Sequence, residues 1–500
     1  MGGDSRISLD PLLGRNRYAC CPRPEPEIAA FGSSTASSIS VAGFQAADRL
    51  RCRIEVELGC RGASAVYAHE LSRVRRELVQ LCGLADLAGL ESVFSSSGTD
   101  AHLIATQLVA EGGESPLLVI MMEGDETGKG VPAALNGRHF SSRSALGLTF
   151  LEGAPLAGAK TVEVAPVPLR SGDGTPRLAD AIHRDVDSLT SLAVKQGQRV
   201  LLILLDQSKT GLIAPSPAFA EALRHRFPDR VDLLVDGCQF RLAPSTLRGY
   251  LEKGFMVALT GSKFLTGPAF SGLLFIPSGL THRLSRCRLP GALSAYSARA
   301  DWPGSWAATA VLDDVANFGL LLRWEAALAE LRAFSILSQV EIRGFLEEFA
   351  RGVQGRLADD PLFDPLPAPG LERGSVGDPA SWDSVPTVFP FLLRRPGRGN
   401  LRGALLNGDE TSEIYRLLQR DLSGSGVAPL TSGGMDAAVL RCQLGQPAAC
   451  GTRDGIALSA LRICASSRLV VEAVATGDSA GILRRVTAAL DKTAWLLYTT

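Results

Sequence analysis

The stretch that decides the fold of this chain is residues 233–272, LLVDGCQFRLAPSTLRGYLEKGFMVALTGSKFLTGPAFSG. An apolar run ends there on an acid, Asp236, and Gln239 follows shortly after it. A second apolar run, residues 256–259, ends on the hydroxyl, glycine and lysine residues of 260–263. Strands of an α/β sheet present their carboxyl ends to one crevice, where ligands bind. The pattern therefore predicts that an acid and a lysine meet at one ligand site.

These residue types suit the cofactor pyridoxal 5'-phosphate (PLP). PLP needs a lysine amine for its aldehyde, a carboxylate to keep its pyridine nitrogen protonated, and hydrogen-bond donors for its phosphate. Lys263 would supply the amine and Asp236 the carboxylate, while Thr260 and Ser262 would add hydroxyl donors. A surface lysine and an ordinary acid at a strand end are the alternatives for these two residues.

The motif resembles that of the fold-type I PLP-dependent enzymes, and most of all their class V aminotransferase and cysteine desulfurase branch. Asp236 and Gln239 match the family's acid and its following Gln or His. Residues 260–263 and the Gly-Pro pair at 267–268 match its lysine segment. The resemblance covers about residues 95–277. It implies an α/β fold with a mostly parallel seven-stranded sheet, helices on both faces, and a small C-terminal α/β domain.

A turn of small and hydroxyl residues, Ser97, Gly98 and Thr99, precedes a helical pattern. The start of a helix presents free backbone N–H groups to an anion. The resemblance implies that this turn binds the cofactor phosphate, together with Thr260 and Ser262. An ordinary helix N-cap is the alternative interpretation of the turn.

The segment that would contact the cofactor ring departs from the family pattern. The family places a His or an aromatic residue after the strand that corresponds to 117–122, and no aromatic residue stands at that place here. The candidates are Thr127, His139 and Glu126. This departure favours a specialised reaction.

The phenolic oxygen of the cofactor has several candidate partners. Ser208 stands where the family has an asparagine that bonds this oxygen. Because a serine side chain is shorter, Asp206 or Gln207 could act in its place. Gln239 would bond the same oxygen or pack near the ring. The resemblance also implies that Lys263 carries a proton between the substrate and the cofactor.

A candidate for substrate binding lies near the C-terminus. The pattern Leu-Arg-Ile followed by small residues, at 461–465, resembles the strand whose arginine holds the substrate α-carboxylate. The planar fork of Arg462 suits a bidentate contact with a carboxylate. A structural ion pair is the alternative role for this arginine.

The chain of 500 residues is long enough for two domains or more. Apolar strand patterns alternate with helical patterns from 94 to 276, which favours a parallel sheet independently of the resemblance. We expect an N-terminal arm and helix over 1–62, a large PLP-binding domain over 63–315, and a connector helix with a small domain over 316–500. The helical pattern of residues 317–349 is the expected connector.

Composition excludes several classes of protein. The formal net charge is -1 and no basic stretch stands out, so nucleic acid is not an expected partner. No apolar run reaches the length of a membrane span and the start lacks a signal core, so we expect a cytoplasmic chain without a membrane partner. The 10 cysteines stand at irregular spacings without paired C-x-x-C motifs, so neither a metal nor a disulfide framework is expected.

The resemblance implies a homodimer that acts on an amino acid or a derivative through external aldimine and quinonoid intermediates. An aminotransferase-like reaction is the first hypothesis. The second is elimination or replacement at Cβ or Cγ, which includes carbon–sulfur lyase, desulfurase-like and S-adenosylmethionine-using reactions of specialised metabolism. A catalytically silent relative that only binds a ligand is a third hypothesis, which Lys263 and Asp236 together argue against.

Overall fold

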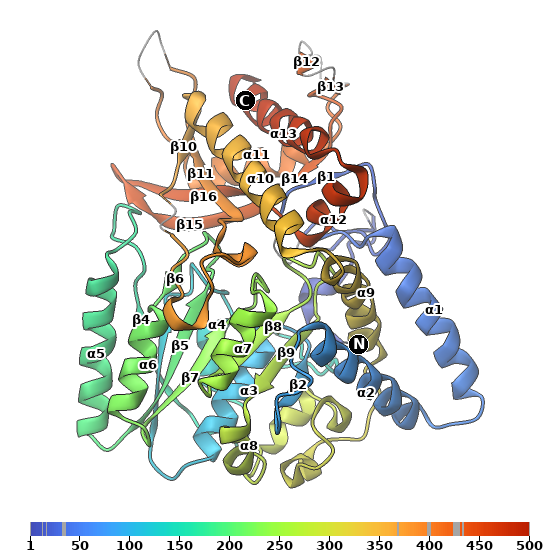
Figure 1. The fold of residues 1–500 in the computed structure, drawn as a ribbon, viewed down its shortest axis with the longest axis vertical. Helices are drawn as coiled ribbons and strands as arrows, with labels where there is room; N and C mark the ends of the chain where they lie inside the picture. The colour runs from blue at the N-terminus through green and yellow to red at the C-terminus, as the bar shows by residue number, and fades with distance from the viewer. Residues whose placement is uncertain are drawn as a thin grey trace.

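The computed structural model describes residues 2–12, 14–16, 18–32, 37–367, 370–397, 402–423, 431–432 and 435–499. A large sheet with helices on both faces fills one half of the molecule, and a smaller antiparallel sheet with its own helices fills the other (Figure 1).

The α-helices of the described residues are α1 (Val41–Leu58), α2 (Ala63–Leu81), α3 (Gly98–Glu111), α4 (Val131–Leu135), α5 (Ala179–Lys195), α6 (Pro217–Arg226), α7 (Pro244–Glu252), α8 (Ser278–Leu284), α9 (Phe318–Ser335), α10 (Gln339–Asp359), α11 (Gly408–Leu418), α12 (Ser467–Thr476) and α13 (Ser479–Thr499). The strands are β1 (Ala29–Ala30), β2 (Glu91–Ser95), β3 (Leu117–Met122), β4 (Glu163–Val167), β5 (Arg199–Asp206), β6 (Ile213–Ala214), β7 (Val231–Asp236), β8 (Met256–Thr260), β9 (Gly272–Ile276), β10 (Phe363–Pro365), β11 (Val388–Leu393), β12 (Thr431–Ser432), β13 (Met435–Asp436), β14 (Cys442–Gln443), β15 (Gly445–Arg453) and β16 (Ile456–Cys464).

The large sheet has the strand order β2-β9-β8-β7-β5-β3-β4, and the short β6 pairs with β5 beside this path. Strands β8, β7, β5, β3 and β4 pair in parallel, whereas β9 is antiparallel to both of its neighbours. The expectation of a mostly parallel seven-stranded sheet is confirmed, with β6 as a short addition.

Alternate residues of the central strands face two different cores, which explains their continuous apolar runs. Val200, Leu202 and Leu204 of β5 pack in one core with residues of α5, α6 and α7. Leu201 and Ile203 of the same strand point into the other core, which α3 and α8 cover. A strand that is covered on both faces has no polar side. The expected helices on both faces are therefore confirmed.

The expected single connector over 317–349 is wrong, because two helices occupy this stretch. Helix α9 ends at Ser335, and the next residue, Ile336, is 83% exposed. The Ser338 hydroxyl then accepts the Glu341 N–H, and the Glu341 carboxylate accepts the Ser338 N–H. This capping box starts α10 as a new helix. Apolar spacing alone does not reveal the break, since both helices bury an apolar face.

The small sheet has the order β10-β11-β16-β15 and is antiparallel. It lies beyond the carboxyl ends of the central strands of the large sheet (Figure 1). The start of the chain joins this part of the molecule, since β1 pairs in parallel with β14. The expected small C-terminal α/β domain is confirmed, whereas the boundaries at 62 and 315 stay predictions. No described helix is long and apolar enough to span a bilayer.

Candidate active site

The acid segment and the lysine segment meet at one edge of the large sheet. Strand β7 ends on Asp236 and strand β8 on Thr260. Asp236 stands opposite Ala258 in the parallel register, so the two strand ends lie side by side. Behind them, the Thr260 hydroxyl donates to the Cys238 carbonyl at 2.7 Å. This edge therefore holds the residues that the sequence singled out first.

The start of α3 closes on these two segments at Gly98. A Cβ at this position would lie 2.5 Å from the sulfur of Cys238 and 3.3 Å from Cγ2 of Thr260. Ser97 caps the helix through its side chain, and Gly98 and Thr99 begin the first turn. N–H groups of a first helical turn have no acceptor within the helix. The turn therefore presents donors for an anion, at a place where only glycine fits.

Buried hydroxyls beside this turn are without partners among the described residues. They are Ser96 Oγ and Thr127 Oγ1. The loop that carries Thr127 reaches the turn, because a Cβ at Gly128 would lie 4.0 Å from Thr99 Oγ1. Burial raises the pKa of the nearby Asp100 carboxyl to about 7, so its charge is reduced near neutral pH. A buried hydroxyl without a partner is costly, and an anion with several acceptor oxygens would satisfy both.

Asp236 is a buried carboxylate that faces positive groups. The Nε2 atom of His102 lies 3.4 Å from its Oδ2, and the charge of Lys263 also acts on it. Burial favours the neutral acid, but His102, Lys263 and the Cys238 side chain outweigh burial and hold the pKa of Asp236 well below its usual range. The Cys238 N–H also donates to Asp236 at 3.1 Å. Asp236 therefore remains an anion, as the partner of a protonated pyridine nitrogen must.

Lys263 follows β8 in a tightly packed turn. Cβ atoms at Gly261 and Gly267 would lie 2.6 Å and 2.7 Å from the Cβ of Ala327 on α9, so the turn has no room to shift toward that helix. In the part of the chain that the structure describes, the Lys263 amine makes no hydrogen bond or ion pair. A fixed backbone with an uncommitted amine is what a covalent cofactor site requires.

Gln239 and Ser262 are buried in the same two segments. The Gln239 carbonyl accepts the Phe264 N–H at 3.2 Å, which ties the acid segment to the lysine segment. The Ser262 carbonyl accepts the Ser37 hydroxyl at 3.2 Å. Because Ser37 precedes α1, an N-terminal part of the chain covers this edge of the sheet.

Ser208 is engaged in a buried polar network. Its hydroxyl donates to Glu126 at 2.7 Å, and Glu126 pairs with Arg170 at 2.7 Å. Gln207 differs, because its backbone has φ 59° and its buried amide has no partner among the described residues. Asp206 is bound to other buried side chains. Of these three residues, Gln207 is therefore the one whose side chain has no described partner.

His139 lies in an aromatic cluster. Its Nδ1 is 2.6 Å from the hydroxyl of Tyr296, and its ring stacks on Phe150 with 3.9 Å between centroids. Burial lowers the pKa of His139, which favours the neutral ring. The described contacts of this ring are thus with two aromatic side chains, and none of them brings it onto Asp236 or Lys263.

Arg462 reaches from β16 of the small sheet to the end of β5. Its Nη1 donates to the Lys209 carbonyl at 3.1 Å and its Nη2 to the Gln446 carbonyl at 2.6 Å. It is 3% exposed, and within the described ranges no carboxylate pairs with it. Burial, with the charges of Arg462 and Lys263, lowers the pKa of Lys209 to about 8. The site therefore holds cations that a bound carboxylate would neutralise.

The sequence did not single out His102 or the first residues of the chain. His102 could have been found by spacing, since it follows Gly98 by one helical turn. The Gly2 N–H donates to the Ala145 carbonyl at 2.9 Å, and the Arg6 guanidinium lies over the ring of Phe270 at 4.9 Å. These first residues therefore contact segments that lie far away in the sequence, and no local pattern predicts such contacts.

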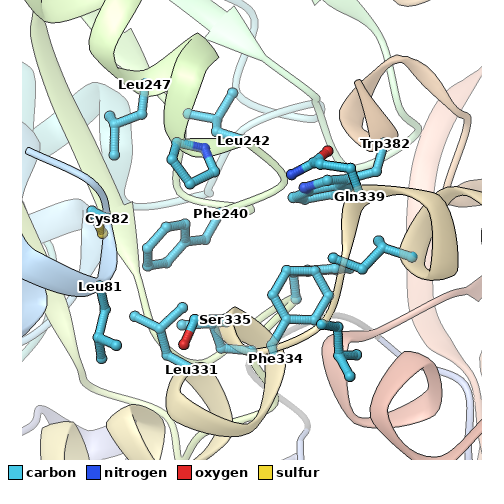
Figure 2. A pocket seen from close by; sticks show the side chains of 15 residues that line it. Leu81, Cys82, Phe240, Leu242, Leu247, Leu331, Phe334, Ser335, Gln339 and Trp382 are labelled. Carbon is cyan, nitrogen blue, oxygen red and sulfur yellow. The ribbon is translucent and has the colours of Figure 1, made fainter. Parts of the chain in front are cut away.

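An apolar cavity of about 100 Å³ lies next to the lysine segment (Figure 2). Phe240, Phe334 and Trp382 point into it, and no charged side chain lines it. Its lining is mostly apolar and holds no cation to pair with a phosphate or a carboxylate.

Two groups of side chains in the described ranges could hold a metal ion, namely His102, Asp236 and Cys238, and Glu57, His69 and Glu70. The first group lies at the end of β7, within the site described above. The expectation that the protein binds no metal stays a prediction.

Comparisons with known proteins show the class of fold. No protein-family model and no curated protein sequence matches the chain. Among solved structures, the chain is similar to the cysteine desulfurase CsdA from Escherichia coli, with 16% identity and a TM-score of 0.50, over 94% of this chain and 96% of that chain. The fold is that of the fold-type I PLP-dependent enzymes, as the motif predicted.

Two further structures share this fold. One is a NifS-like protein, with 14% identity and a TM-score of 0.51 over 92% of this chain and 99% of that chain. The other is the cystine C–S lyase C-DES in complex with its product cysteine persulfide, with 14% identity and a TM-score of 0.51 over 92% and 98%. At these identities the likeness concerns the fold alone.

Proposed function

We propose that this chain is a PLP-dependent enzyme that acts on an amino acid or an amino-acid derivative, with an aminotransferase-like reaction as the first candidate. One observation carries the proposal: the ionised Asp236 and the uncommitted amine of Lys263 meet beside the helix start at Gly98. PLP, when bound, withdraws electrons from the bonds at the substrate Cα.

The residues of the site fit this cofactor. Lys263 would hold the aldehyde carbon, Asp236 the pyridine nitrogen, and the N–H groups of Gly98 and Thr99 the phosphate. Further contacts are proposed for Ser97, Thr127, Gln239 and Ser262, and for Gln207 in preference to Ser208. The expected phosphate contact of Thr260 is not proposed, because its hydroxyl already donates to the Cys238 carbonyl. His139 would act only from its aromatic cluster. The unpartnered hydroxyl of Thr127 and amide of Gln207 support this assignment, because ligand oxygens would satisfy them.

The reaction requires a group that moves a proton at the substrate. With PLP bound, the amine of Lys263 would be the group that accepts the proton of the substrate Cα. Asp236 stays ionised at the opposite end of the cofactor ring. Arg462 would orient the substrate through its carboxylate.

Replacement of Arg462 tests the carboxylate contact. We expect Arg462→Gln to raise KM for the amino acid by about 10–100-fold, because a charge-assisted hydrogen bond is lost. The change in kcat should be smaller. Arg453→Gln is the matched control, since Arg453 lies on β15 and pairs with Asp364 at 3.3 Å outside the site. Steady-state kinetics of both variants measure KM and kcat. An unchanged KM for Arg462→Gln would show that Arg462 does not bind the substrate carboxylate.

Elimination or replacement at Cβ or Cγ is the alternative reaction, and Lys209 favours it. A second amine with a pKa of about 8 beside Lys263 can exchange a proton with a leaving group, which transamination does not require. A desulfurase also needs a reactive cysteine. Burial raises the pKa of Cys442 to about 12 and of Cys450 to about 11. Neither thiol therefore supports the desulfurase version.

Product analysis separates the two reactions. The PLP-loaded protein is mixed with a panel of amino acids that includes S-adenosylmethionine. A keto acid together with the aminated cofactor indicates transamination, and release of a leaving group indicates elimination or replacement. If no amino acid changes the absorption spectrum, the result supports a catalytically silent protein that only binds a ligand, and the proposed function fails. The expected homodimer stays a prediction, which the mass of the protein in solution tests.

A further inference from the structure

His102 lies inside α3, between the helix start and the acid of β7. It is 1% exposed, its Nδ1 is 2.7 Å from the Gly98 carbonyl oxygen, and its Nε2 is 3.4 Å from Asp236 Oδ2. A carbonyl oxygen only accepts hydrogen bonds, so Nδ1 must carry a proton. One imidazole therefore contacts both the phosphate-binding turn and the carboxylate expected at the pyridine nitrogen.

The contact with Asp236 determines the charge of His102. In a neutral ring with Nδ1 protonated, Nε2 would turn a lone pair toward the carboxylate of Asp236. A proton on Nε2 replaces this repulsion by the attraction of opposite charges. Burial opposes the charged ring, but Asp236 outweighs burial and raises the pKa of His102. The other groups that face it are the Lys263 amine, which opposes this effect, and the Cys238 thiol.

We propose that His102 is a cationic positioning residue, which keeps Asp236 ionised and oriented toward the cofactor ring and links that carboxylate to the turn at Gly98. The proposal rests on the proposed function. One helix then positions both ends of the cofactor, the phosphate through its first turn and the ring through His102. A histidine that merely filled the core would have neither the charge nor this link.

The proposal has an electrostatic consequence that packing does not have. A positive ring close to the cofactor makes protonation of the cofactor harder, so it lowers the pH at which the visible absorption band of the loaded protein changes. Replacing His102 by a neutral side chain removes this charge. The midpoint should then rise by about one pH unit, as expected for a charge a few ångströms away in a partly shielded interior.

The test compares His102→Asn and His102→Gln with Thr106→Val. Thr106 lies one turn further along α3, is buried, and its hydroxyl has no partner among the described residues. The Thr106→Val substitution therefore perturbs the same helix without removing a charge. The midpoint of the absorption band and the dissociation constant of PLP are measured for each. We expect both His102 variants to shift the midpoint upward and to bind PLP about 10-fold more weakly, because a charged contact is lost, and Thr106→Val to change neither.

If the variants do not fold, a nitrogen NMR titration of the wild-type protein without PLP tests the proposal, because it follows the protonation of each histidine ring. The chain has 6 histidines. One ring should remain doubly protonated at a pH at which an ordinary histidine is neutral. If all the rings are neutral there, or if folded variants keep the wild-type midpoint, the proposal is overturned. Wild-type protein that takes up no PLP would instead overturn the proposed function.

Discussion

Lys263→Ala is expected to abolish the visible absorption band of the PLP-loaded protein and to lower turnover by roughly 10⁴-fold or more, because one amine serves as both covalent tether and proton carrier. The amine has no competing partner in the described part of the chain, and it lies close enough to Asp236 to lower the pKa of that acid. Absorbance after removal of free PLP measures the first effect, and steady-state kinetics measure the second.

Lys209→Ala is the matched control for the tether. Lys209 is the neighbouring amine, but its Nζ donates to the Asp125 carbonyl at 2.8 Å. We therefore expect this variant to keep the absorption band. Reduction of the loaded wild-type protein with borohydride, followed by peptide mass spectrometry, should place the cofactor on Lys263. A cofactor found on Lys209, or a band that survives in Lys263→Ala, would contradict the assignment.

Asp236→Asn is expected to lower turnover by about 10²–10³-fold, because a preorganised charge at the reacting system is removed. The amide has nearly the same shape, so the variant tests the charge rather than the packing. It cannot stabilise a protonated pyridine nitrogen, and it leaves His102 without its anionic partner. We therefore expect weaker PLP binding as well, measured by equilibrium dialysis.

Asp232→Asn is the control for this second prediction. Asp232 lies on the same strand and is also buried, but it pairs with Arg199 at 2.7 Å and Arg283 at 2.5 Å at the other end of β7. Loss of these ion pairs should lower the melting temperature and leave the absorption band in place. If Asp236→Asn behaves like Asp232→Asn, then Asp236 has a structural role only.

The sequence predicted the parallel sheet because each buried strand is a continuous apolar run that ends on recognisable residues. Asp236 and Lys263 belong to one stretch of the chain, and the strands that carry them are neighbours, so their meeting could be predicted from local pattern and one rule of sheet topology. The division of the connector into α9 and α10 was missed, because the apolar spacing continues across the capped break at Ser338.

The tertiary structure decided which polar groups are free and which are already bound. Ser208 matched the family position in the sequence, but in the fold its hydroxyl is bound to Glu126 while the Gln207 amide has no described partner. Likewise, only the fold shows that Arg462 lies without a described acidic partner.

By itself, the sequence determined the class of fold and the strand ends that carry an acid and a lysine, because periodicity and end residues are local properties. The tertiary structure alone decided that His102 faces Asp236 and that Gly98 closes on Cys238. These pairs lie far apart in the chain. Their contact depends on how α3 packs across the sheet, and no local pattern specifies a distance between such segments.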